Sequence, residues 1–282
     1  NEVGNDPARF SLSVDAFHAA CVARAERHPR MLLAGTTHDT KRSADTRARL
    51  LALTTIPEAF DLHVRRWFAV TDHLVGDPGP TATERWFLFQ TLLGSWPLTF
   101  DRLEAYLLKA VREAGLTTAW VDGDERHEAA LVDFARQLFE VPAFWADFVP
   151  FAQRVARLGE RISVAQVLLR ATTPGVCDVF QGDETWFLSL VDPDVRRPTD
   201  HPARRRQLDS VRSGARPTRA TAKLHVLQRA LELRRRRPEP FAGEYRPHPA
   251  GRATLAFARG SDQVLVVVPL RRDPDAHVEV PS

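Results

Sequence analysis

Residues 31–42 read Met-Leu-Leu-Ala-Gly-Thr-Thr-His-Asp-Thr-Lys-Arg, a short apolar run that ends in polar and charged side chains. An apolar run of this length is typical of a buried parallel strand, which we predict over 31–35. Parallel strands of a barrel or open sheet deliver polar residues at their carboxyl ends, where active sites lie. The stretch therefore predicts an α/β fold with His38 and Asp39 at a strand end.

A second stretch repeats this arrangement far downstream. Residues 174–182 read Pro-Gly-Val-Cys-Asp-Val-Phe-Gln-Gly, in which a predicted strand over 176–180 again ends in polar groups. Together the two stretches favour a sugar-acting (β/α)8 barrel. A glycosidase needs a pair of carboxylates, however, and the sequence offers one good candidate, Asp39.

Composition bounds the class of protein. The chain has 282 residues, 44% hydrophobic, with a formal net charge of +3. So small a charge argues against a nucleic-acid binder. The sequence contains no run of 18 apolar residues, so we predict no membrane-spanning helix. Two cysteines make no disulfide framework, so we expect a reducing cytoplasm. The chain starts at Asn1 without methionine and ends soon after a strand pattern, so we expect a piece of a longer protein.

Between the two strands the pattern is helical almost throughout. We predict helices over 59–74, 83–93, 102–114, 127–139 and 143–158, then a short helix over 163–170. Residues 183–220 are predicted to be a long polar loop, and residues 254–257 and 264–268 alternate like antiparallel strands. The predicted organisation is late barrel units over 1–56, a helical insertion over 57–160, a last barrel strand, loop and final helix over 161–237, and a partial small β domain over 238–282.

The sequence resembles a known family in several stretches. Residues 36–43 resemble the fourth signature region of the α-amylase superfamily (glycoside hydrolase family 13), in the version found in maltooligosyltrehalose synthases. Residues 89–97, 109–114 and 173–182 resemble further parts of that family, in the same order. The resemblance implies the C-terminal part of a TIM barrel with a large helical insertion. Where the family pattern differs, this chain has Cys177, Phe180, Asp183, Thr185 and Val195.

The resemblance implies an activity. These enzymes convert the reducing-end α-1,4 link of a maltooligosaccharide into an α,α-1,1 link by intramolecular transglucosylation, a step of trehalose biosynthesis. In the family the nucleophile and the acid/base glutamate lie on earlier strands, so this chain alone is expected to be inactive. Its expected partners are the substrate and the missing N-terminal half of the barrel, and no metal or other cofactor is implied.

Asp39 is, by resemblance, the third catalytic carboxylate, which would hold two sugar hydroxyls. The alternative for Asp39 is a cap on the following helix, which Ser43 can also cap. His38 would donate to a sugar hydroxyl, or else be a buried histidine bonded to the backbone. Lys41 would reach the reducing-end glucose, or else be a solvated surface residue. Arg42 is assigned to substrate binding, with an ion pair as its alternative.

Five further residues complete the predicted substrate site: Gln181, Glu184, Trp186, Arg196 and Arg197. Glu184 could equally form a structural ion pair, and the two arginines could simply pin their loop. The other tryptophans lie in the helical insertion, where core packing is expected. Alternative functions are an α-1,4-glucan hydrolase or glucanotransferase, or a non-catalytic carbohydrate-binding fragment.

Overall fold

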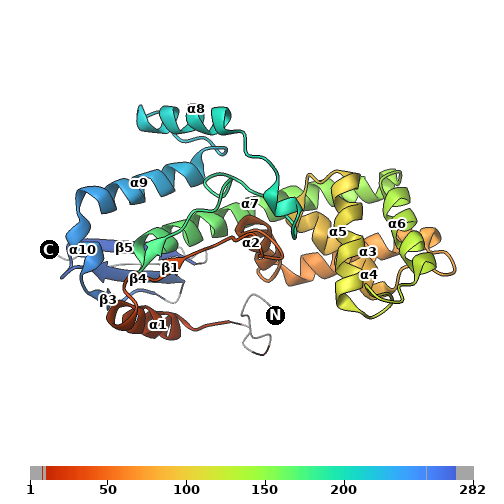
Figure 1. Ribbon diagram of the computed structural model, residues 1–282, viewed down its shortest axis with the longest axis horizontal. Helices are drawn as coiled ribbons and strands as arrows, with labels where there is room; N and C mark the ends of the chain where they lie inside the picture. Colours follow the sequence, from red (N-terminus) through yellow and green to blue (C-terminus); the bar gives the residue numbers. More distant parts are fainter. Residues whose placement is uncertain (1–7, 9–10, 252, 271–282) are drawn as a thin grey trace. The chain divides into compact units, whose positions relative to one another are not determined.

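The computed structural model describes residue 8, residues 11–251 and residues 253–270, and these residues are mostly helical with small sheets (Figure 1). The helices are α1 (Val14–Arg27), α2 (Ala44–Leu53), α3 (Pro57–Thr71), α4 (Ala82–Ser95), α5 (Phe100–Ala114), α6 (Glu125–Leu138), α7 (Pro142–Thr172), α8 (His201–Arg212), α9 (Ala222–Arg236) and α10 (Pro238–Ala242), with 3₁₀ turns η1 (Asp72–Leu74) and η2 (Asp194–Arg196). The strands are β1 (Leu32–Leu33), β2 (Val176–Cys177), β3 (Tyr245–Pro247), β4 (Thr254–Arg259) and β5 (Val264–Pro269).

The chain divides into two compact units. The first comprises Asn1–Thr40, Arg161–Phe187 and Pro198–Ser282, and the second comprises Lys41–Glu160 and Leu188–Arg197. The predicted domains 1–56, 57–160, 161–237 and 238–282 stay a prediction. Their outer ends, 1–7 and 271–282, lie outside the described residues.

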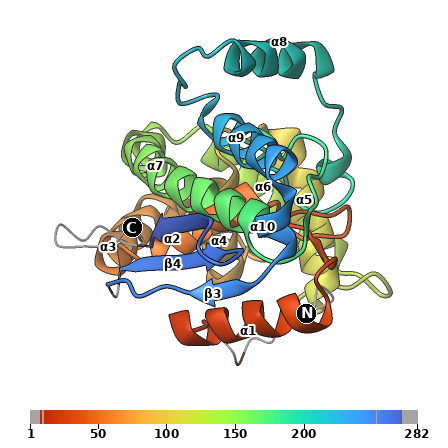
Figure 2. The same cartoon turned by 90° about the vertical axis from the view of Figure 1, so that its left-hand side faces the viewer.

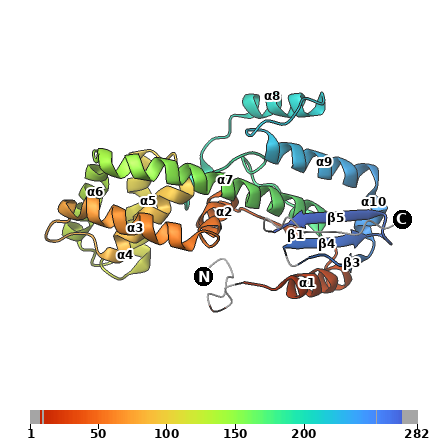
Figure 3. The same cartoon turned by 180° about the vertical axis from the view of Figure 1, so that it is seen from behind.

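The second unit is a bundle of helices (Figure 3). Trp67 lies in its hydrophobic core. The indole of Trp67 is fully buried and packs edge-on against Phe89 and Phe144, with ring centroids 5.6 and 5.8 Å away. The predicted helices of this region are confirmed. Core packing holds for Trp67, but Trp86 and Trp120 are exposed, at 43% and 61%.

A three-stranded antiparallel sheet, in the order β3-β4-β5, organises part of the first unit. The predicted strands near 254–257 and 264–268 are thus confirmed, and β3 joins them. Helix α1 packs against β3, and α8 lies beside α9 (Figures 1 and 2). Cys21 of α1 and Phe257 of β4 are both fully buried in the cluster under this sheet. The apolar residues that alternate along the strands of the sheet drive the packing of this cluster.

The two strands that carry the polar motifs pair in parallel. Leu32 is opposite Val176, and Leu33 is opposite Cys177. Each strand is only two residues long, shorter than predicted, and the described residues contain no closed barrel. Leu32 is 67% exposed and Val176 is 44% exposed, so this pair is uncovered on one side.

Helix α7 corrects a predicted break. The sequence predicts two helices with a gap near Gly159, but one helix of 31 residues runs from Pro142 to Thr172. A side chain at Gly159 would lie 2.8 Å from the Cα atom of Arg49 on α2. The glycine therefore allows a close approach between helices and does not end one.

The predicted long loop over 183–220 is also wrong in part, because it contains α8. The carboxylate of Asp200 caps this helix by accepting from the backbone N–H of Ala203 at 2.9 Å. Of the residues in α8, Val211 is the one that is buried, so no apolar stripe marks the helix in the sequence.

Candidate functional site

The parallel pair places both motifs at the same ends of neighbouring strands. The backbone N–H of Val176 donates to the carbonyl of Met31 at 2.9 Å, and that of Asp178 donates to Leu33 at 3.1 Å. The segment after β1 and the segment after β2 therefore start side by side.

A tight turn presents His38 and Asp39 at its tip. The hydroxyl of Thr40 accepts from the backbone N–H of Thr37 at 2.8 Å and lies 2.9 Å from the hydroxyl of Thr37. The Nε2 atom of His38 lies 3.1 Å from Oδ2 of Asp39, with 62% and 76% of the two side chains exposed. The alternative of a buried His38 is therefore wrong.

Asp39 does not cap the following helix. The N-cap of α2 is Ser43, whose hydroxyl accepts from the backbone N–H of Thr46 at 3.4 Å. Ser43 was predicted as this cap from the sequence. The carboxylate of Asp39 is thus left at the surface of the turn, in a position to accept hydrogen bonds from a ligand.

Lys41 and Arg42 belong to the second unit. The ammonium of Lys41 lies 3.1 Å from Oε2 of Glu113 on α5. The guanidinium of Arg42 lies over the rings of Phe87 and Tyr106, 5.3 and 5.9 Å from their centroids. The predicted alternative for Arg42 was an ion pair, and the structure instead shows it against aromatic rings.

The three predicted site residues after β2 lie in the first unit. Gln181 is exposed. Glu184 forms an ion pair with Arg204 on α8 at 3.1 Å, which agrees with its structural alternative. The indole N–H of Trp186 donates to the carbonyl of Arg219 at 2.9 Å, which fixes a partly exposed ring.

Arg196 and Arg197 are both tied into their own turn in the second unit. Arg196 pairs with Asp192 at 2.5 Å, and Arg197 pairs with Asp194 at 3.0 Å. Asp194 also accepts two hydrogen bonds from Arg102, at 2.7 and 2.9 Å. Burial alone would raise the pKa of Asp194, but the hydrogen bonds from Arg102 lower it overall. These contacts favour the alternative in which the arginines pin the loop.

Sequence reasoning missed a buried ionic cluster beside Glu184. The carboxylate of Asp183 is fully buried and lies 2.8 Å from a guanidinium nitrogen of Arg170 and 2.9 Å from the ammonium of Lys223. The only signal in the sequence was the acidic residue itself, at a position where the family pattern differs. Its partners stabilise the segment that carries Glu184.

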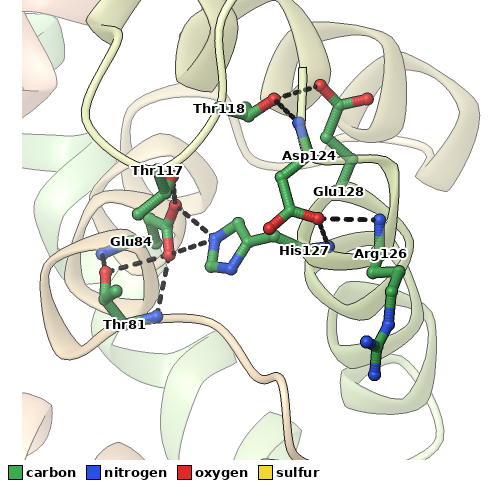
Figure 4. A network of polar contacts seen from close by, with 8 residues as sticks. All are labelled: Thr81, Glu84, Thr117, Thr118, Asp124, Arg126, His127 and Glu128. Carbon is green, nitrogen blue, oxygen red and sulfur yellow. Dashed lines mark hydrogen bonds and ion pairs between the residues drawn. The ribbon is translucent and has the colours of Figure 1, made fainter. Parts of the chain in front are cut away.

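A second buried polar network lies in the helical unit (Figure 4). The imidazole of His127 points at the carboxylate of Glu84, with Nε2 2.9 Å from Oε1. Burial alone would raise the pKa of Glu84, but hydrogen bonds from Thr117, His127 and Thr81 lower it overall. Thr81 and Glu84 also form a reciprocal capping box at the start of α4. With every member bonded, the network joins helices and serves the fold.

Neither a metal cluster nor a membrane helix is found in the described part of the chain. Among these residues, no three His, Cys, Asp or Glu side chains come together as metal ligands. No described helix combines the length and apolar character needed to cross a bilayer.

Comparison with known proteins places this arrangement in context. No protein-family model matches the chain. A Mycobacterium tuberculosis protein with the provisional name maltooligosyl trehalose synthase, found in two strains, is 35% identical over 280 residues, covering 95% of this chain and 34% of the relative. The chain thus spans about a third of the length of these curated relatives.

Solved structures give the same result. Maltooligosyltrehalose synthase from Arthrobacter ramosus matches with a TM-score of 0.84 and 39% identity, covering 95% of this chain and 35% of that one. Another maltooligosyl trehalose synthase crystal structure matches with a TM-score of 0.85 and 26% identity, covering 95% and 38%.

Proposed function

Because the chain is homologous over 95% of its length to a portion of maltooligosyltrehalose synthase, we propose that it forms the corresponding part of such an enzyme. The parent protein would convert the reducing-end α-1,4 link of a maltooligosaccharide into an α,α-1,1 link. The observation that carries this proposal is the exposed His38-Asp39 turn at the end of β1, beside the end of β2. In the parent protein, β1 and β2 would be neighbouring strands of a (β/α)8 barrel.

The proposed reaction is a transfer with retention. A nucleophilic carboxylate and a general acid break the α-1,4 link and leave a covalent glycosyl–enzyme intermediate. The released glucose then attacks that intermediate through its anomeric hydroxyl, so one glycosidic bond breaks and one forms. Both reacting carboxyl groups would come from outside this chain, so the chain alone is expected to be inactive.

Asp39 would act as the third carboxylate. Its charge accepts hydrogen bonds from sugar hydroxyls, and such charge-assisted bonds are strong. They stabilise most where positive charge develops on the sugar in the transition state. Support comes from its exposure at the strand end and from the assignment of the helix cap to Ser43.

The rest of the proposed site has unequal support. His38 beside Asp39 and Lys41 two residues later would hold sugar hydroxyls, and Gln181 and Trp186 are accessible enough to contribute. Arg42, Glu184, Arg196 and Arg197 engage protein partners, so we propose that they stabilise the segments that carry them and do not contact sugar directly. Water must be kept from the intermediate, because otherwise hydrolysis competes.

The test uses the full-length protein that carries this chain, with maltopentaose as substrate. We expect reducing ends to disappear while the glucose units per molecule stay constant. Asp39→Asn should lower the rate at least about 100-fold, because it removes a charge that acts in the transition state. Asp209→Asn, an exposed residue of α8, is the matched control. If the unmodified protein releases glucose or maltose as its main products and forms no α,α-1,1 link, it is a hydrolase and the proposal is contradicted.

A further inference from the structure

Helix α5 carries a charged motif, residues 109–114, that the proposed function leaves unexplained. Its three charged side chains reach three different places in the second unit. Lys109 donates to the carbonyl of Asp192 at 2.8 Å, and Arg112 donates twice to the carboxylate of Glu128, at 2.8 and 2.6 Å. Both of these contacts hold parts of the second unit together and serve the fold. The third member, Glu113, pairs instead with a lysine to which the proposed function assigns sugar binding.

Glu113 lies between two lysine ammonium groups. Its Oε2 atom is 3.1 Å from Nζ of Lys41, and its Oε1 atom is 3.8 Å from Nζ of Lys109. Lys109 is held in place by the carbonyl of Asp192, so it is a fixed positive charge. The carboxylate therefore attracts Lys41 toward α5 and offsets the repulsion between the two ammonium groups.

The neighbouring residue is fixed by the same helices. Arg42 lies over Phe87 of α4 and Tyr106 of α5, and its guanidinium also lies 3.5 Å from the hydroxyl of Thr91. The backbone that carries Lys41 is thus anchored at the next residue. Glu113 acts on the charged end of the Lys41 side chain.

We propose that Glu113 is a positioning residue that holds Lys41 for the reducing-end glucose, so that helix α5 governs whether this glucose is re-bonded or released. The inference rests on the proposed function of the parent protein. The Lys41 side chain is 40% exposed and that of Glu113 is 35% exposed. An ion pair this accessible adds little to stability, yet it sets the place of an ammonium that a sugar hydroxyl could reach.

The consequence concerns the fate of the released glucose. While this glucose is held and turned, its anomeric hydroxyl attacks the covalent intermediate and gives the α,α-1,1 product. If it is lost, water attacks instead, and free glucose accumulates with a shortened oligosaccharide. Loss of the Glu113 charge removes the attraction that offsets the repulsion between Lys41 and Lys109, and we expect the Lys41 ammonium to shift as a result.

The experiment compares Glu113→Gln with the unmodified full-length protein on maltopentaose, measuring kcat, KM and the fraction of turnovers that release glucose. We expect that fraction to rise several-fold and kcat/KM to fall roughly tenfold, because a misplaced group far from bond cleavage still affects orientation. Thermal stability should be unchanged. Glu104→Gln, on the same helix and with its carboxylate 3.9 Å from Arg136, is the matched control and should behave as the unmodified protein.

A double variant separates positioning from a general effect on the fold. If Glu113 acts through Lys41, then Glu113→Gln should add no further effect to Lys41→Met. Additive effects of the two substitutions, or an unchanged glucose fraction in Glu113→Gln, would overturn the inference. Failure of the unmodified protein to form the α,α-1,1 link would instead contradict the proposed function, so the two failures are distinguishable.

Discussion

The ammonium of Lys223 donates to Oδ1 of Asp183 at 2.9 Å, and neither side chain is more than 1% exposed. The other carboxylate oxygen accepts from Arg170 at 2.8 Å, so two cations share one anion in the interior. Removal of the anion leaves two uncompensated charges, whereas removal of one cation leaves a pair. We therefore predict that Asp183→Asn lowers the free energy of unfolding by about 3–5 kcal/mol, and Lys223→Met by about 1–3 kcal/mol.

Urea denaturation of both variants provides the measurement. The order of the two losses is the decisive result, because each magnitude depends on how the interior relaxes. A Lys223→Met variant less stable than Asp183→Asn would mean that Arg170 alone cannot hold the carboxylate.

The lowered pKa of Glu128 predicts that the free energy of unfolding falls at acidic pH. Its two hydrogen bonds from Arg112, with a further bond from Thr118, lower the pKa of Glu128 to about 2 from 4.5. The folded state therefore binds the proton less readily than the unfolded state. This contribution to stability, up to about 3 kcal/mol, is full above pH 4.5 and is lost as the pH falls toward 2.

The measurement is the free energy of unfolding between pH 6 and pH 2.5, for the unmodified chain and Glu128→Gln. The variant should be less stable at pH 6, and its curve should be flatter. Glu125→Gln, an exposed residue of the same helix, should retain the slope. Parallel curves for the unmodified chain and Glu128→Gln would rule out this explanation.

Trp67 and Trp86 form a matched pair for testing the helical core. Trp67 is fully buried and donates from its indole to Asp147 at 2.8 Å, whereas Trp86 is 43% exposed. Trp67→Ala should cost about 3–5 kcal/mol through the cavity that it leaves. Trp86→Ala should cost less than about 1 kcal/mol. Thermal unfolding followed by circular dichroism measures both, and equal losses would contradict the assignment of the core.

Two arginines close the C-terminal end of α7. Arg234 donates to the carbonyl of Ala171 at 2.9 Å, and Arg259 donates to that of Thr172 at 3.2 Å. These carbonyls have no partner within the helix, and buried acceptors left unpaired are costly. Arg259→Met should therefore lower the free energy of unfolding by about 1–3 kcal/mol. Arg205→Met, at an exposed site, should leave the urea midpoint in place.

Elements that bury an apolar stripe could be predicted from the sequence, and elements without one could not. The five predicted helices of the second unit and the strands β4 and β5 follow from apolar periodicity, and their placement confirms it. Helix α8 was not predicted, because its residues are almost all polar or exposed. The break predicted near Gly159 was wrong because a glycine can mark either the end of a helix or a close contact. The backbone of Arg49, which faces Gly159, shows that it is a close contact.

The candidate site shows the same division. The strand ends that carry His38 and Asp39 follow from local sequence, and so does the Ser43 cap. The partners of Lys41, Arg42 and Glu184 lie on segments distant in sequence, so no local pattern could identify them. The roles proposed for these residues toward sugar stay predictions.

The pairing of β1 with β2 has a kinetic consequence. Leu32 and Val176 lie on either side of nearly the whole helical unit along the chain, yet only two residues of each strand pair. So small a contact gains too little to close so long a loop in an unfolded chain. We therefore expect the helical unit to fold first and the strand end that presents Asp39 to be assembled later.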